Sequence, residues 1–183
     1  MKKLLVLSAF AMSGLVAFAQ GTINFNNRVP GSGVNAPVQN GSGVLLSGTQ
    51  FQAQLMAGLD AGSLIAVGTP LSFKTGSLAG YFGITTAVVV PSVAPGGIAV
   101  AQIRAWNTQA GATYSDAVTT GWGYGASKIF DVKTGGDGSP PSVPGDMINL
   151  GTSGWSLSVV PEPSVMALGL LGAVGLLIRR RKA

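Results

Sequence analysis

QFQAQLMA, residues Gln50 to Ala57, carries the clearest structural pattern in this chain. Within it, Phe51, Ala53 and Leu55 alternate with glutamines. Successive side chains of a β-strand point to opposite faces of the sheet. The alternation therefore predicts a strand with one face in a hydrophobic core and the other face in water.

The region from residue 20 to residue 160 shows the same type of pattern along most of its length. Short apolar runs are separated by turn-forming dipeptides at intervals of about eight to twelve residues, and no window has a convincing amphipathic helical period. This spacing is typical of an all-β domain, and we expect a single antiparallel β-sandwich of jelly-roll or immunoglobulin-like type. Besides Gln50–Ala57, the expected strands are Thr22–Asn26, Gly43–Leu46, Leu71–Lys74, Tyr81–Val90, Ile98–Trp106, Lys128–Val132 and Trp155–Val160.

Two segments rich in glycine and proline are expected to be loops. Gly31–Gly43 combines glycines with small polar residues, and we expect it to be mobile. Gly135–Gly145 contains prolines that a central strand does not accommodate, because proline cannot donate to a sheet ladder. We expect this second segment to connect the final strands.

Residues 1–19 have the pattern of a signal peptide. A basic start is followed by the apolar run Leu4–Val16 and by Ala17 and Ala19 in an A-x-A arrangement, so we expect signal peptidase to release a chain that starts at Gln20. As the chain contains no cysteine, lipid attachment at cysteine and disulfide bonds are excluded.

Residues 161–183 form a second segment that we expect to lie outside the folded domain. The acidic motif Pro161-Glu162-Pro163 precedes an apolar run at residues 164–178, for which we expect a single transmembrane helix. That helix would be about 22 Å long, so spanning a hydrocarbon core of about 30 Å needs help from snorkelling arginines and local thinning of the bilayer. A basic cluster then orients the helix with its end in the cytoplasm. The cluster consists of Arg179, Arg180, Arg181 and Lys182.

This order of acidic motif, apolar run and basic cluster resembles the tail of the PEP-CTERM family of bacterial exported proteins. Gly21–Arg28, Ala53–Leu55 and Gln102–Trp106 further resemble a group of short PEP-CTERM proteins of verrucomicrobial type. The resemblance implies processing by a membrane transpeptidase, the exosortase, near Pro161-Glu162-Pro163. It also implies a Gram-negative bacterium with exopolysaccharide, in which the protein is anchored in the inner membrane in transit and then reaches the cell surface or the medium.

The charge of the chain reports this targeting and not a nucleic-acid partner. The whole chain has a formal net charge of +5. Within residues 20–160, however, the basic and acidic residues balance, so no basic patch for a phosphate backbone is expected. The five basic residues there are Arg28, Lys74, Arg104, Lys128 and Lys133, and the five acidic residues are Asp60, Asp116, Asp131, Asp137 and Asp146.

The composition also excludes most catalytic chemistry. Without His or Cys the chain has no Ser-His-Asp triad, no thiol nucleophile and no typical zinc site, and we expect no enzyme activity, metal or cofactor. Asp131, Asp137 and Asp146 lack the spacing of a calcium loop. The favoured interpretation is that Asp137 belongs to a turn and that Asp131 is a solvated strand end.

Trp122 and Tyr124 are the candidate carbohydrate-binding residues. Glycines flank both rings in Gly121–Gly125, which would let the rings stand out on a loop and stack on sugars. The alternative is that both rings point inward as the core of a short strand. For Arg104 we expect a structural ion pair, with stacking on a ring as the alternative.

Together these features predict an exported surface or matrix protein with a structural or adhesive role, as in a biofilm. A second hypothesis is a module that binds exopolysaccharide through Trp122 and Tyr124, and a third is a secreted enzyme of an unrecognised type.

Overall fold

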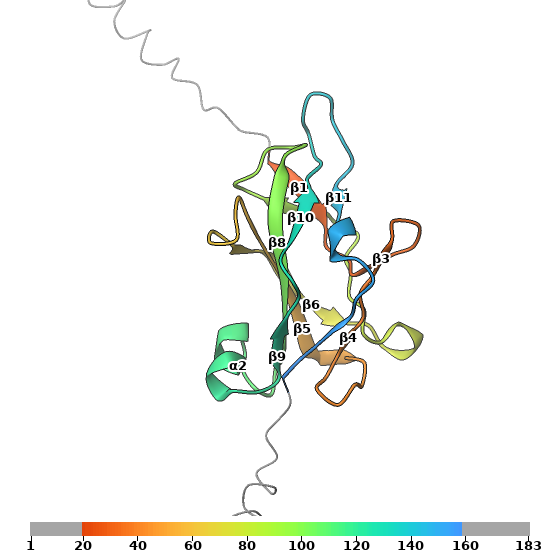
Figure 1. Ribbon diagram of the computed structural model, residues 1–183, viewed down its shortest axis with the longest axis vertical. Coiled ribbons are helices and arrows are strands. Elements are labelled where there is room, and N and C mark those ends of the chain that lie inside the picture. The colour runs from red at the N-terminus through yellow and green to blue at the C-terminus, as the bar shows by residue number, and fades with distance from the viewer. Residues whose placement is uncertain (1–19, 159–183) are drawn as a thin grey trace, which may run out of the picture.

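The computed structural model describes residues 20–158, which form a β-rich domain with one short α-helix (Figure 1). The predicted signal peptide at 1–19 and the predicted sorting motif, transmembrane helix and basic cluster at 161–183 lie outside the described residues. No helix within residues 20–158 is long and apolar enough to cross a membrane.

The largest sheet has five strands, all paired antiparallel. The strands β5 (Gly48–Gly58) and β8 (Ile98–Asn107) lie at its centre, and β6 (Ile65–Phe73) extends it beyond β5. On the other side of β8, β10 (Phe130–Lys133) pairs with the first half of that strand and β9 (Tyr124–Ala126) pairs with the second half. The strand predicted at Gln50–Ala57 is thus confirmed as the middle of the sheet.

The remaining strands form smaller sheets. A three-stranded sheet contains β11 (Gly145–Asp146), β1 (Gly21–Asn24) and β7 (Val88–Val90) in that order. The two-stranded sheets are β2 (Arg28–Val29) with β3 (Val34–Asn35), and β4 (Val38–Gln39) with β12 (Trp155–Ser156). Short 3₁₀ turns, η1 (Gly76–Leu78) and η2 (Ile148–Leu150), complete the domain.

The prediction of a β-rich fold is confirmed, but the expectation that all pairs would be antiparallel is wrong. The pairs β1–β11 and β4–β12 are parallel. Parallel partners need long connections, so they come from distant parts of the chain and leave no local signal in the sequence. The strands are accordingly distributed over several sheets of mixed pairing.

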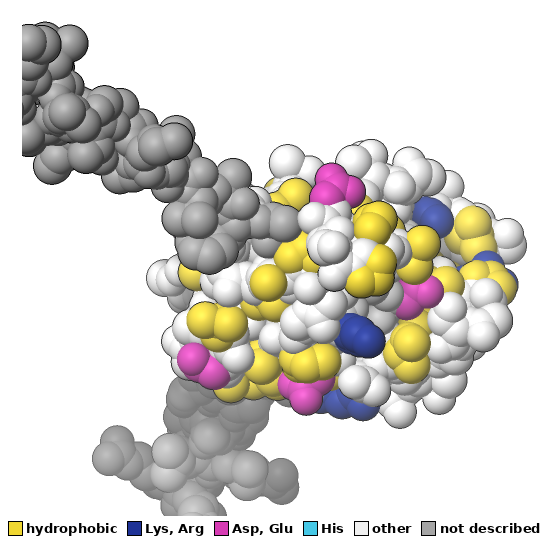
Figure 2. All heavy atoms as spheres, turned by 90° about the horizontal axis from the view of Figure 1, so that it is seen from above, with side chains coloured by type: hydrophobic (Ala, Val, Ile, Leu, Met, Phe, Trp, Pro, Cys, Tyr) yellow, Lys and Arg dark blue, Asp and Glu magenta, His cyan; other side chains and the backbone are white. Residues whose placement is uncertain are grey.

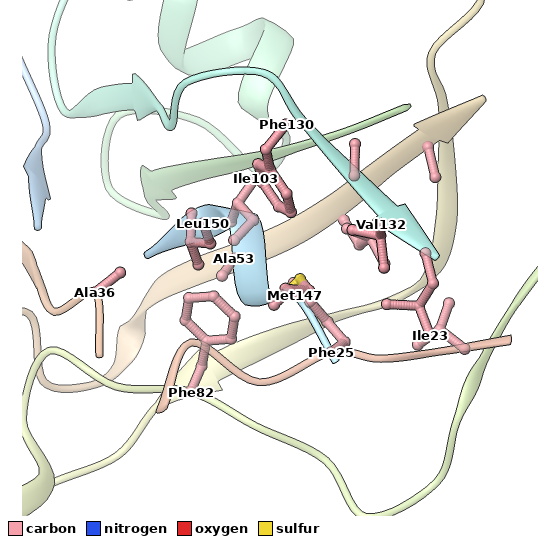
Figure 3. Packing of buried hydrophobic residues seen from close by; sticks show 14 of the residues in the cluster. Ile23, Phe25, Ala36, Ala53, Phe82, Ile103, Phe130, Val132, Met147 and Leu150 are labelled. Atoms are coloured by element: carbon pink, nitrogen blue, oxygen red, sulfur yellow. The ribbon is translucent and has the colours of Figure 1, made fainter. Parts of the chain in front are cut away.

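The core lies between the five-stranded sheet and the smaller sheets with their loops (Figure 3). The central strands contribute mostly alanines, and large side chains from the opposite layer fill the space above them. The rings of Phe25 and Phe82 are 4.9 Å apart, and Phe82 also meets Phe73 edge-on. Small side chains on one layer and large ones on the other allow close packing without voids. The inward alanines are Ala53, Ala57, Ala99, Ala101 and Ala105.

The fully buried side chain of Asn27 ties three segments together around this core. Its amide nitrogen donates to the carbonyl oxygens of Ala36 at 2.8 Å and Gly80 at 3.0 Å. Its amide oxygen accepts from the backbone N–H of Phe82 at 2.8 Å. A buried amide costs little free energy only when its hydrogen bonds are made, and here both ends of the amide are satisfied.

Helix α2 (Tyr114–Thr120) was not predicted from the sequence. It begins with a capping box, because the N–H of Asp116 donates to the Thr113 hydroxyl and the N–H of Thr113 donates to the Asp116 carboxylate. It ends at Gly121, whose φ of 83° is the left-handed conformation that glycine adopts freely. Figure 1 shows α2 at the end of the domain where β9 lies.

Candidate ligand-binding groove

The face of the five-stranded sheet that points away from the core carries polar and aromatic side chains. Arg104 of β8 lies opposite Gln54 of β5, and Trp106 lies opposite Tyr124 of β9. Since side chains two apart share a face of a strand, Arg104 and Trp106 point to the same side of the sheet. The buried Ile103 and Ala105 point to the core side.

A groove of about 530 Å³ lies between this outer face and the segment that contains α2. Strands β5, β6 and β8 form one wall, and Tyr114 with Val118 of α2 belongs to the other. Most of the lining is apolar, and Arg104 is its one charged residue in the part of the chain that the structure describes. The lining includes Gln54, Met56, Pro70, Arg104, Tyr114 and Ser115.

Arg104 and Tyr114 join the two walls. The guanidinium carbon of Arg104 lies 5.2 Å from the centroid of the Tyr114 ring, a cation–π arrangement. The Nε of Arg104 also donates to the Gln102 side-chain oxygen at 3.5 Å. Of the two expectations for Arg104, stacking on a ring is therefore the one found.

Tyr114 lines the groove and also belongs to an aromatic cluster. Its ring meets Trp106 edge-on at 6.5 Å and Tyr124 edge-on at 5.9 Å. Burial raises the pKa of the Tyr114 phenol above its ordinary value, because burial disfavours the charged phenolate, and the nearby Arg104 opposes this rise. The phenol is therefore neutral at physiological pH.

Two polar groups of the lining are held in place without using all of their hydrogen-bonding capacity. The amide nitrogen of Gln54 donates to the carbonyl oxygens of Val67 at 2.8 Å and Leu55 at 3.1 Å. These bonds fix the amide, while its oxygen accepts no hydrogen bond within residues 20–158. Trp106 is 4 % exposed, and its buried indole N–H lacks a partner among the described residues.

Trp122 and Tyr124 lie beside the groove and do not line it. Both are half-buried and pack against a small hydrophobic cluster that contains Trp106 and Ala117. Their role as carbohydrate-binding residues stays a prediction.

The acidic side chains do not gather into a metal site within residues 20–158, where no group of three potential ligands occurs. The carboxylate of Asp146 instead accepts hydrogen bonds from Asn24 at 2.8 Å and Ser32 at 3.0 Å. Figure 2 shows basic and acidic side chains interspersed on the face in view, without a patch of one sign.

Comparison with known proteins identifies the region that follows the domain. Residues 159–182 match the model of the PEP-CTERM protein-sorting motif. The chain carries a PEP-CTERM sorting signal. This signal implies an exported protein that an exosortase sorts to the cell surface. Neither the comparison with curated proteins nor that with solved structures found a match.

The sorting signal begins directly after Ser158. Ser158, the last described residue, donates its N–H to the carbonyl oxygen of Tyr124 at 2.7 Å. The matched range includes Pro161-Glu162-Pro163 and the basic cluster Arg179–Lys182, which all lie outside the described residues. The signal is thus joined to the domain beside the aromatic cluster.

The groove was not predicted from the sequence, although the sequence contains signals for two of its parts. The alternation of Gln102, Arg104 and Trp106 places three polar or aromatic side chains on one face of a strand. The spacing of Thr113 and Asp116 is that of a capping box. These signals indicate a short helix and a strand face with aromatic and basic side chains, but not that the two lie together.

Proposed function

We propose that this protein is a structural or adhesive component of the bacterial surface or extracellular matrix, delivered there by an exosortase-like transpeptidase. The observation that supports this most strongly is the sorting motif directly after a well-packed β-domain. The balanced charge of residues 20–160 fits a component that packs among neutral or mixed polymers. The proposal assigns the domain no catalytic activity, because the sequence has no His and no Cys.

Mass spectrometry of the protein from its native host tests the sorting part of this proposal. We expect a mature chain that starts at Gln20 and ends near Pro161-Glu162-Pro163, with any attached group visible as added mass on the new terminus. A Glu162→Gln variant should accumulate as the longer precursor, whereas Asp137→Asn should be processed normally. A wild-type mature chain that still contains Arg179–Lys182 would contradict processing by an exosortase.

A strain that lacks the β-domain tests the structural or adhesive part. The variant keeps residues 1–19 and 159–183 and replaces the domain by a neutral linker, so export and sorting stay available. We expect reduced attachment of cells to surfaces or to one another, with restoration by the full chain. Unchanged attachment with normal surface display of the full chain would count against an adhesive role.

A second candidate function is binding of surface polysaccharide. It is favoured by the open groove beside an aromatic cluster, because aromatic and apolar surfaces take the C–H faces of sugars. If the rings of Trp122 and Tyr124 beside the groove form the binding surface, Trp122→Ala should abolish retention on an exopolysaccharide column. Unchanged retention would show that Trp122 does not bind the polysaccharide.

A further inference from the structure

We infer that the groove between α2 and the five-stranded sheet binds a carboxylated sugar, a uronic acid unit of an acidic polysaccharide. The inference rests on the proposed adhesive role and names its ligand. It concerns residues other than Trp122 and Tyr124, which lie outside the groove. Three features of the groove support it: its charge, its apolar lining and its unused hydrogen-bonding groups.

The charge of the groove favours an anionic ligand. Arg104 is half-buried in the lining, and no acidic side chain of the described residues lines the groove with it. Helix α2 contains the acidic residue Asp116, but its carboxylate accepts the N–H of Thr113 in the capping box. The Tyr114 ring takes the flat face of the guanidinium, and Nε donates to Gln102, so the two terminal nitrogens of Arg104 stay available for a carboxylate.

The apolar part of the lining fits the ring of a sugar. Met56, Pro70 and Val118 line the groove around Arg104 and carry no polar side-chain hydrogen. A pyranose has one face made largely of C–H groups, and such a face gains free energy when it leaves water for an apolar surface. A volume of about 530 Å³ lies within the range of small-ligand sites, and the groove is open, so a chain can continue beyond the bound unit.

The unused polar groups favour a ligand that also has hydroxyl groups. The amide oxygen of Gln54 is an acceptor that the Val67 and Leu55 carbonyls hold in place through the amide nitrogen. The exposed hydroxyl of Ser115 lines the other wall. A fatty acid would leave the Gln54 oxygen without a donor, and a neutral sugar would leave Arg104 without a counter-charge. A uronate satisfies both, because it has hydroxyl donors and a carboxylate on one ring.

Calorimetric titration of the full chain, purified in detergent, with oligogalacturonate tests the inference. The matched probe is the methyl ester of the same oligosaccharide, which keeps the ring and hydroxyls and loses the charge. We expect binding of the acid and at least tenfold weaker binding of the ester. Equal affinity for acid and ester, or no binding of either, would overturn the inference.

Variants locate the binding in the groove. Arg104→Gln should weaken binding of the acid at least tenfold, and Lys128→Gln, which removes an exposed cation outside the groove, should leave it unchanged. Ala66→Trp, at an exposed position of the lining, should block the groove without removing a polar contact. The melting temperature checks that each variant folds. Equal losses of affinity in Arg104→Gln and Lys128→Gln would mean that net charge alone drives binding. That result would overturn the assignment of the binding site to the groove.

Surface display separates failure of this inference from failure of the proposed function. The wild-type chain on intact cells is labelled with an antibody to the domain. Normal display and cell attachment without uronate binding would overturn only the groove assignment. Absence of the wild-type chain from the surface would overturn the proposed function itself.

Discussion

The guanidinium carbon of Arg104 lies 5.2 Å from the centre of the Tyr114 ring. This contact links strand β8 of the central sheet to the short helix α2. A helix of seven residues is too short to be stable alone, and it depends on such tertiary contacts. The Tyr114 ring also touches Trp106 and Tyr124 by its edges. Tyr114 therefore helps to hold the outer wall of the groove in place, together with the buried Ala117.

Replacement of Tyr114 by alanine should destabilise the domain by about 2 kcal/mol, because a half-buried ring and its cation–π contact are lost together. Urea unfolding followed by fluorescence measures the change in the free energy of unfolding. Tyr114→Phe keeps the ring and should cost less than about 0.5 kcal/mol. A loss in Tyr114→Phe as large as in Tyr114→Ala would assign the effect to the hydroxyl instead.

The raised pKa of Tyr114 predicts a loss of stability at high pH. Burial favours the neutral phenol in the folded state, with Arg104 opposing, so the folded protein holds this proton more tightly than the unfolded chain. The resulting stability is present below a pH of about 10 and is lost as the pH rises through the folded-state pKa. Unfolding free energies at several pH values from 8 to 11 should fall more steeply for wild type than for Tyr114→Phe. Parallel curves would show that Tyr114 does not contribute.

Asn27→Ala should lower the free energy of unfolding more than Asn149→Ala does. It removes the Asn27 bonds to the buried Ala36 carbonyl and the buried Phe82 N–H, whereas the Gly80 carbonyl keeps the N–H of Val38, and the loss costs about 3 kcal/mol. The matched change is Asn149→Ala, at an exposed residue that makes one hydrogen bond, to the Asp131 carbonyl. That change should stay within about 0.5 kcal/mol of wild type in chemical denaturation. Similar values for both variants would refute the structural role of Asn27.

Thr113→Ala should loosen the start of α2. The lost capping bond to the Asp116 N–H is worth about 1 kcal/mol. Thr119→Ala is the control, because its exposed hydroxyl bonds only the carbonyl of Ser115 within the helix. Amide hydrogen exchange across Tyr114–Thr120 should speed up in the first variant and not in the second. Unchanged exchange in both would mean that packing alone fixes the helix.

The sequence predicted those parts of the structure that depend on one continuous segment. In β5, the alternation correctly placed Ala53 and Leu55 on the core face. The same alternation placed Gln54 in water, but Gln54 is only 8 % exposed, because its amide bonds the backbone of the neighbouring strand and it lies in the groove wall. Alternation distinguishes the two faces of a strand and cannot say what covers the second face.

The expected mobile loop at Gly31–Gly43 was wrong for a related reason. It contains β3 and β4, and Val34, Ala36 and Val38 are buried. Their alternation was visible, but the surrounding glycines and prolines dominated the composition. Strand β3 pairs locally with β2, but the partner of β4 is β12, which lies near the end of the domain sequence.

Of the candidate sites, the one formed by a continuous segment was predicted and the one formed by distant residues was not. The sorting motif was recognisable because acidic, apolar and basic parts follow one another along residues 159–182. The groove combines Gln54, Arg104 and Tyr114, which only the fold brings together. Pair contacts of this kind leave no contiguous signal, so they became visible only in three dimensions.

The hydrogen bond between Ser158 and Tyr124 has a mechanical consequence. The sorting signal leaves the domain at this point, and Tyr124 pairs with Trp106 in the strand that carries Arg104. A pull between a polymer held in the groove and the tethered end of the chain would load β8 and β9 first, together with the pairing of β12 and β4 just before Ser158. Strand β1 lies at the far end of the long axis in Figure 1, away from this path. Shear on the cell would thus leave most of the hydrophobic core unloaded.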